Sequence, residues 1–174
     1  MSSQNPSMKK NIITYGLLLG VVSVAFNIML YTMDMHYQQS FMAGIVGMVI
    51  LVGVLLYAFV NYKKQNEGYL SLSEALKLGL GITLVSAIIG VLYSFVLTEF
   101  LDPDMVQKAM DFQIEQMRAA NPEISQEQID MRRGMSEKFS SPLFRSAFQI
   151  IGALFVGFIV SLIGGLIVKK SRPE

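Results

Sequence analysis

Four long stretches of this sequence contain no aspartate, glutamate, lysine or arginine, and they limit the fold more than any other feature. They cover residues 12–33, 41–60, 78–98 and 146–168. Crossing about 30 Å of hydrocarbon takes about 20 helical residues at about 1.5 Å each, so every stretch is long enough. A chain of 174 residues has nothing large enough to bury four such helices in a soluble core. The sequence therefore predicts four membrane-spanning helices.

Signals at the helix starts extend two of these helices beyond the charge-free stretches. Ser71 and Glu74 have the spacing of a capping box, in which each side chain bonds the backbone of the other residue. Ser141 followed by Pro142 is typical of a helix start. We predict spans over residues 12–33, 41–60, about 74–98 and about 142–168, in a single membrane domain over residues 1–174. The predicted fold class is all-α, an integral membrane four-helix bundle.

The composition excludes several classes of function. Only 16% of the residues are charged, against about 25% in soluble domains. The absence of cysteine excludes disulfides, thiolate metal sites and a cysteine nucleophile. A net charge of +1 gives no basic excess to neutralise phosphates, so nucleic acid is not an expected partner. We also expect no cofactor.

Basic residues indicate how the chain is oriented in the membrane. Three short segments beside the predicted spans carry Lys9, Lys10, Lys63, Lys64, Lys77, Lys169, Lys170 and Arg172. The 34–40 loop has no basic residue except its histidine, and the 99–145 loop offsets its basic residues with acids. Because short loops rich in lysine and arginine stay in the cytoplasm, both termini and the 61–77 loop are predicted inside. We predict a multi-pass protein of the cell (inner) membrane with the 99–145 loop outside.

The loop between the third and fourth spans, residues 99–141, is predicted to be helical and extracytoplasmic. Asp102 before Pro103 predicts one helix start, and Ser125 with Gln128 predicts a second. Apolar residues recur at helical spacing in both segments, at Val106, Ala109, Met110, Ile114 and Met117, and at Met131, Met135 and Phe139. We expect these stripes to face each other or the bundle; a partner groove or an interfacial anchor is the alternative.

Small residues recur along one face of the first and fourth predicted spans. Such spacing lets helix backbones approach closely, which is a main source of helix association in lipid. The two faces comprise Gly16, Gly20, Ser23 and Asn27, and Ala153, Gly157, Ser161 and Gly165. We expect them to pack the four helices together, with a lined pore or a homodimer seam as the alternative.

Asn27 is the most polar side chain deep in a predicted span. An amide at that depth usually hydrogen-bonds to a neighbouring helix, and Ser86 and Ser161 are the candidate partners. A role in binding a substrate is the alternative.

The predicted spans lack the groups that membrane enzymes and proton-coupled pumps use. Pumps place an ionisable group at mid-membrane depth, and intramembrane proteolysis needs an aspartate pair, a Ser–His dyad or a metal site. No charged residue or histidine lies within the four stretches, and the single histidine, His36, falls in the 34–40 loop. We expect His36 to be a surface residue and the protein not to be an enzyme.

Two charged clusters lie near the ends of the predicted spans. The outer one comprises Asp34, Glu99, Asp102 and Asp104. Its carboxylates could hold a divalent cation, but helix capping is the simpler interpretation, and we expect no metal. The inner one is Glu74 with Lys77, for which a helix start is favoured over a gating role. The candidate functional residues are Asn27, Glu74, Lys77, Glu99, Asp102 and Arg145.

Three segments carry a family resemblance: EGYLSLSEALKLG at residues 67–79, KKNIITYG at residues 9–16, and Asp102-Pro103-Asp104. With these segments the chain resembles the bacterial integral membrane proteins grouped as domain of unknown function 4199, over roughly residues 8–170. The resemblance implies a four-helix membrane protein with a long loop between the third and fourth spans. It implies no activity and no catalytic residues.

Two functions fit the sequence. The first is a non-enzymatic structural or regulatory membrane protein that acts through its outer loop or through oligomerisation. The alternative is a small-solute transporter or channel component, which would have to oligomerise because four helices alone pack into a solid bundle. The expected partners are the lipid bilayer and a second copy or another membrane protein.

Overall fold

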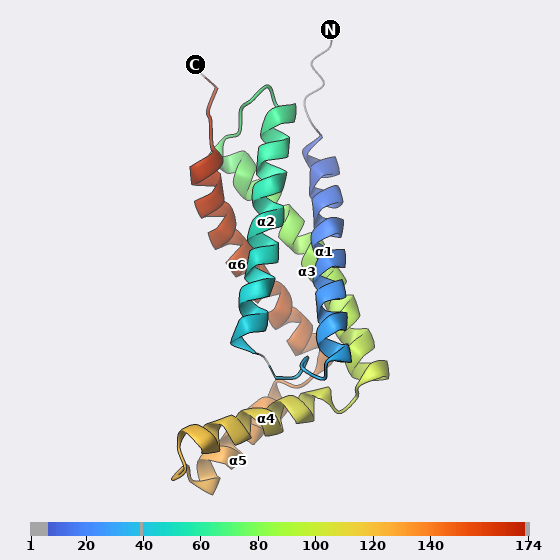
Figure 1. The fold of residues 1–174 in the computed structure, drawn as a ribbon, viewed down its shortest axis with the longest axis vertical. Helices are drawn as coiled ribbons and strands as arrows, with labels where there is room; N and C mark the ends of the chain where they lie inside the picture. The colour runs from blue at the N-terminus through green and yellow to red at the C-terminus, as the bar shows by residue number, and fades with distance from the viewer. Residues whose placement is uncertain (1–6, 39, 173–174) are drawn as a thin grey trace.

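The computed structural model describes residues 7–38 and 40–172, and Figure 1 shows their arrangement. Six α-helices and one π-helical turn follow in order: α1 (Met8–Thr32), α2 (Phe41–Gln65), α3 (Leu72–Val96), η1 (Leu97–Leu101), α4 (Met105–Ala120), α5 (Gln126–Lys138) and α6 (Pro142–Val168). The extreme ends of the predicted 1–174 domain, and residue 39 of the 34–40 loop, lie outside the described residues.

Four of these helices are long and apolar enough to cross a membrane: α1, α2, α6 and the continuous run Leu72–Leu101 that α3 and η1 form. This confirms the prediction of an all-helical chain with four spans. The helices extend past the charge-free stretches because their ends accept polar residues. Ser7 caps α1 by accepting a hydrogen bond from the Lys10 amide at 3.2 Å. Lys63 and Lys64 occupy the last turn of α2, where their positive charges interact favourably with the negative end of the helix dipole.

The four long helices form a bundle, and α4 and α5 extend across its axis at one end (Figure 1). The first and last described residues and the α2–α3 connection lie at the opposite end. We call this opposite end the terminal end, the end with α4 and α5 the arm end, and α4 with α5 the arm.

Small residues bring α1 and α6 close to α3, as predicted. Gly16 and Gly20 of α1 lie against Val85 and Ile89 of α3. On the other side of α3, Gly157, Ser161 and Gly165 of α6 lie against Thr83, Gly79 and Ala75. Because α3 packs against Gly16, Gly20, Gly157, Ser161 and Gly165, these positions are not free to line a pore or a homodimer seam, whereas Asn27 on the same face of α1 is exposed.

Packing is much tighter at the terminal end than at the arm end. Leu55, Phe59, Leu78 and Ile82 are fully buried in a core that belongs to the terminal half of the bundle. By contrast, no residue of α2 before Leu55 is buried, and none of α6 before Gly157. A side chain added at Gly44 or Gly47 of α2 would meet nothing within 4 Å. The arm-end halves of α2 and α6 are therefore largely uncovered by this chain.

The arm is a helical hairpin held mainly by polar contacts. Arg132 and Arg133 of α5 donate to Gln113 and Asp111 of α4 at 2.9 and 3.0 Å. Ser125 and Gln128 form the predicted capping box at the start of α5. The buried residues of the arm are Ile114 and Ile129.

The two apolar stripes of the arm were expected to face each other or the bundle, and for the second stripe this is wrong apart from Phe139, whose ring packs against Phe144 of α6. Met131, Met135 and Phe139 are exposed. The reason is the rotation of α5, whose residues advance about 100° each. Because Ile129 is buried and Arg132 and Arg133 reach α4, the stripe formed by the other apolar residues turns away.

Candidate functional site

A buried cluster around Asp102 joins three segments at the base of the arm. Its carboxylate Oδ2 lies 2.9 Å from Nε2 of His36, in the α1–α2 loop, and Oδ1 accepts from Nζ of Lys108 on α4 at 2.8 Å. The Asp102 amide donates to the Leu97 carbonyl at 2.7 Å, a bond that closes the π-helical turn. Asp102 therefore ties the end of α3, the α1–α2 loop and the start of the arm together.

Aromatic rings enclose the histidine of this cluster. The His36 ring packs edge-on against Tyr31 and Tyr37, with centroids 5.0 and 5.3 Å apart, and Tyr37 packs against Phe112 of α4 at 6.1 Å. The His36 side chain is only 4% exposed. The expectation of a surface histidine is therefore wrong, because the partners that bury it lie far away in the sequence. Its Nδ1 is buried and has no hydrogen-bond partner among the described residues.

The electrostatics of this cluster favour an ionised Asp102. Burial raises the pKa of the carboxyl group, but the hydrogen bonds that it accepts from Lys108 and His36 and the charges of these partners outweigh burial, so the pKa lies below its ordinary value. The hydrogen bond to Asp102 raises the pKa of Lys108 in turn. Asp102 was predicted to cap α4; instead α4 begins at Met105, with Asp104 preceding it and making no side-chain capping bond. Asp102 therefore forms an ion pair with Lys108 and does not act as a helix cap.

The outer acids do not converge on a common point. Asp102 faces Lys108 and His36, whereas Glu99 lies 3.8 Å from Arg145 at the start of α6. No group of three histidine, cysteine, aspartate or glutamate side chains that could hold a metal ion occurs in the part of the chain that the structure describes.

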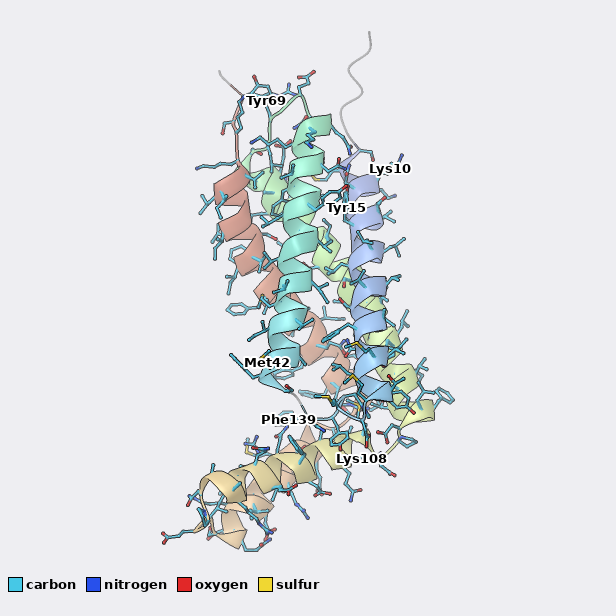
Figure 2. All side chains as sticks on the ribbon, viewed as in Figure 1. Lys10, Tyr15, Met42, Tyr69, Lys108 and Phe139 are labelled. Atoms are coloured by element: carbon cyan, nitrogen blue, oxygen red, sulfur yellow. The ribbon has the colours of Figure 1, made fainter. Side chains whose placement is uncertain are left out.

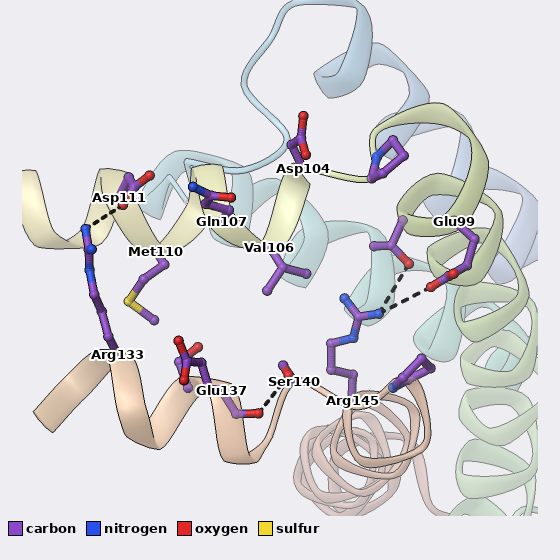
Figure 3. A pocket seen from close by; sticks show the side chains of 14 residues that line it. Glu99, Asp104, Val106, Gln107, Met110, Asp111, Arg133, Glu137, Ser140 and Arg145 are labelled. Carbon is purple, nitrogen blue, oxygen red and sulfur yellow. Dashed lines mark hydrogen bonds and ion pairs between the residues drawn. The ribbon is translucent and has the colours of Figure 1, made fainter. Parts of the chain in front are cut away.

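A cleft of about 690 Å³ opens between the arm and the ends of α3 and α6. Figure 3 shows Arg145 reaching across it to Glu99, and Arg133 paired with Asp111. Nη2 of Arg145 also donates to Oγ1 of Thr98 at 3.4 Å. Asp104 and Glu137 add two further carboxylates to the lining, so acids outnumber arginines. The arrangement can bind polar or cationic groups and holds two of the predicted residues, Glu99 and Arg145.

At the terminal end, Glu74 is held by the start of its own helix. Its carboxylate accepts from the Ser71 amide at 2.7 Å and the Ser71 hydroxyl at 2.8 Å, and the Ser71 hydroxyl accepts from the Glu74 amide. This confirms the predicted capping box. Nδ2 of Asn66 adds a third contact to Glu74 at 3.3 Å. No ion pair joins Glu74 to Lys77 in the described structure, so the two do not form the pair that a gate would use.

The chain's last described residues dock on the α2–α3 connection. Leu70 and Lys170 exchange two backbone hydrogen bonds of 2.9 Å, and Leu70 is fully buried. Arg172 pairs with Glu67 at 3.2 Å and, like Lys170, lies over the ring of Tyr69. A cleft of about 590 Å³ is lined by Tyr69, Lys77, Lys170 and Arg172, among others. Sequence reasoning missed this contact because it joins segments about a hundred residues apart.

Asn27 does not bond to a neighbouring helix. Its Nδ2 donates to the Ser23 carbonyl of its own helix at 2.8 Å, and the side chain is exposed. Ser161, one of its candidate partners, is fully buried, and its hydroxyl has no hydrogen-bond partner in the described residues. The prediction of a cross-helix bond by Asn27 is wrong, because the helix places its amide where no neighbouring helix lies within hydrogen-bonding distance.

Two other asparagines make the cross-helix bonds. Asn61 of α2 donates to the Tyr15 hydroxyl of α1, and Asn11 of α1 donates to Oε1 of Gln65 at 3.2 Å. Both join α1 to α2 at the terminal end. Sequence reasoning passed over them because Asn11 and Asn61 lie one residue outside the predicted spans.

Comparison with known proteins gives one match. The model of a family described as "Protein of unknown function (DUF4199)" matches residues 14–170. No curated protein and no solved structure matches the chain.

Proposed function

The chain belongs to the DUF4199 family, whose function is unknown, and from that premise we propose a non-enzymatic membrane protein that acts through contacts with other proteins in the membrane. Such a protein has a structural or regulatory role. The proposal starts from a multi-pass membrane architecture with four apolar helices.

One observation supports this proposal more than any other: the arm-end half of the bundle is unfinished as a packed structure. α2 has no buried residue over its first fourteen positions, and Phe41 is 82% exposed. The terminal half, in contrast, buries its own core and pairs Asn11 with Gln65 and Asn66 with Glu74. Because helices in lipid associate by close packing of small residues, the open glycines Gly44 and Gly47 leave room for another helix.

The exposed amide of Asn27 also supports association with another helix. It lies about five residues, or about 8 Å, from the arm end of α1. One amide hydrogen bonds the Ser23 carbonyl, but the rest of the exposed group has only lipid to face. Hydrocarbon offers no hydrogen bonds, so a polar group there is stabilised by a partner helix.

Several features argue against catalysis as the role. The four spans carry no charged residue at mid-depth. The buried side chains of His36 and Asp102 pair with each other, and Asp102 also pairs with the partly exposed Lys108. Chemistry on a substrate would need at least one such group to reach it.

We further propose that the termini lie in the cytoplasm and the arm outside, in the cell (inner) membrane. The lysines that flank the spans at the terminal end support this orientation. Reporter fusions at the C-terminus and in the 119–125 turn test it. Opposite compartments are expected, and the same compartment for both reporters would contradict the orientation.

Cysteine scanning along α2 tests the association, since the chain contains no cysteine of its own. Single cysteines at positions 42–54 are expected to cross-link to a second copy, or to another protein, with a period of about 3.6 residues. Ala58→Cys serves as the control, because Ala58 is fully buried within one chain. Absence of any periodic cross-link over positions 42–54 in native membranes would contradict the proposal.

A transporter or channel component acting as an oligomer is the second candidate. The exposed Asn27 favours it, because an amide at that depth could line a path formed between copies. Solute flux into proteoliposomes that disappears with Asn27→Leu, while the cross-linked oligomer persists, would favour this candidate over the first.

A further inference from the structure

An apolar strip runs along the side of α5 that faces away from α4. It consists of Met131, Met135 and Phe139, and we call it the α5 strip. These side chains are 61%, 56% and 48% exposed. They repeat every four residues, so they form one continuous line along the helix. The described chain leaves about half of each of these side chains uncovered.

The α5 strip continues an exposed apolar surface of α6. The Phe139 ring packs edge-on against the Phe144 ring, with centroids 5.3 Å apart. From there Phe148 and Ile151 extend the exposed apolar surface along α6. Because α6 is long and apolar enough to span a membrane, this surface lies within the bilayer. The α5 strip is thus joined directly to a surface that is embedded in the membrane.

The Phe139 end of the strip lies next to the side of the arm that faces the bundle. Arg132 is about 20° around the helix from Phe139 and about 60° from Met135. It lines a cleft of about 620 Å³ together with Phe41, at the start of α2. Figure 2 draws Phe139 at a level between Met42 at the start of α2 and Lys108 on α4. The arm itself runs across the bundle axis, in the direction of a membrane surface (Figure 1).

Charges are placed around the strip as in a helix that lies in a membrane surface. Arg132 and Lys138 flank the strip, each about 60° from its centre. Arg132 also donates to Gln113 of α4, and the long side chain of Lys138 can reach lipid phosphates. Asp130 and Glu137 lie on the opposite side of α5, at about 140° and about 160° from that centre, together with Arg133, whose charge is paired with Asp111 of α4. All five side chains are exposed. Basic residues beside an apolar stripe, with acids opposite, fit an interface of phospholipid headgroups and acyl chains.

We propose that α5 is an interfacial membrane anchor, with the α5 strip inserted at the boundary between the headgroups and acyl chains of the leaflet at the arm end. The arm then lies on the membrane and does not project from it. The cleft between the arm, α3 and α6 is held at the membrane surface as a result. This inference concerns lipid contact alone, so it stands independently of the protein association proposed above.

A fluorescent label that reports polarity tests the proposal in the full-length chain. Single cysteines are introduced as Met135→Cys in the strip and Asp130→Cys as the matched control on the opposite side of α5. Each labelled protein is reconstituted into vesicles of phosphatidylcholine and phosphatidylglycerol. Lipids with brominated acyl chains are expected to quench the label at position 135 but not at 130, whereas aqueous iodide quenches the label at 130 but not at 135.

Two results would overturn the proposal. If iodide quenches both labels equally, the arm projects into water. If neither quencher reaches the label at position 135, protein covers the strip, and the strip belongs to the association surface.

A second variant separates the strip from the rest of the fold. Met131→Ser with Phe139→Ser, in the Met135→Cys background, is expected to abolish quenching by brominated lipid and to open the label to iodide. A label at Val49→Cys reports whether the bundle itself is unchanged. Undiminished lipid quenching at position 135 in this variant would show that the strip does not hold α5 on the membrane.

Discussion

At the scale of single residues, Asp102 decides how the arm joins the bundle. Its carboxylate pairs with Lys108 on the arm and His36 in the α1–α2 loop, and almost all of it is buried. A buried carboxylate that loses its charge no longer accepts charge-assisted hydrogen bonds from both partners, at a cost of about 1–3 kcal/mol. The base of the arm should therefore depend on this one side chain.

Asp102→Asn is expected to lower the thermal unfolding midpoint of the protein in detergent. The expected loss is about 1–3 kcal/mol, because an amide cannot compensate the charge of Lys108. Asp104→Asn is the matched control, since Asp104 is exposed and makes no capping bond. Equal effects of the two substitutions would contradict the role assigned to Asp102.

The same pair predicts a pH dependence with a definite sign. The pKa of Asp102 is lower in the folded chain than its ordinary value. Its stabilising contribution is therefore complete above the unfolded value, about 3.9, and is lost as the pH falls through the folded value. The stability difference between the native chain and Asp102→Asn should stay constant from pH 7 to about pH 5. It should shrink as the pH falls further; a difference that grows on acidification would contradict the ion pair.

Several single residues show what a sequence can and cannot predict. The capping box of Ser71 with Glu74 was predictable because both partners lie within one helical turn. The burial of His36 was not, because its partner Asp102 lies 66 positions away. The bond of Asn27 was also mispredicted, since depth in the membrane does not say which way a side chain points.

At the scale of elements, α3 organises the bundle. Glycines of α1 and α6 press against its two sides, and this packing was predictable from the spacing of small residues. Which helix each face meets was not predictable. The spacing of small residues shows which side of a helix packs closely, but it does not show which other helix packs there. The rotation of α5 likewise depends on bonds from Arg132 and Arg133 to α4, which no periodicity encodes.

Gly157→Ala should test the contact between α6 and α3. An added Cβ would lie 2.8 Å from Cγ2 and 2.9 Å from Cβ of Thr83. Thr83 is fixed by its own bond to the Gly79 carbonyl, so it has little freedom to move. Overpacking of this kind costs about 1–3 kcal/mol, which a thermal unfolding series in detergent would detect.

Gly152→Ala is the control for this prediction on the same helix. A Cβ at position 152 would meet nothing within 4 Å. Unfolding midpoints that fall equally for both substitutions would mean that α6 and α3 do not meet as described.

At the scale of the whole molecule, the chain divides into a closed terminal end and an open arm end. The four long helices were predicted correctly from length and hydrophobicity, and the helical loop was predicted from its capping residues and the spacing of its apolar residues. The division between the two ends was not predictable, since apolar residues fill both halves of every span. It depends on which side chains have neighbours, and the arm-end halves of α2 and α6 have few.

The central claim is that another protein covers the open arm end. Native mass spectrometry of the full-length chain, extracted from its membrane in a mild detergent, tests this most directly. We expect a particle with at least two copies, or with one copy and another membrane protein. Cysteines at positions 42–54 are expected to form cross-links within this particle. A particle that holds a single copy and only lipid, under conditions where the fold is intact, would show that no other protein covers the arm end.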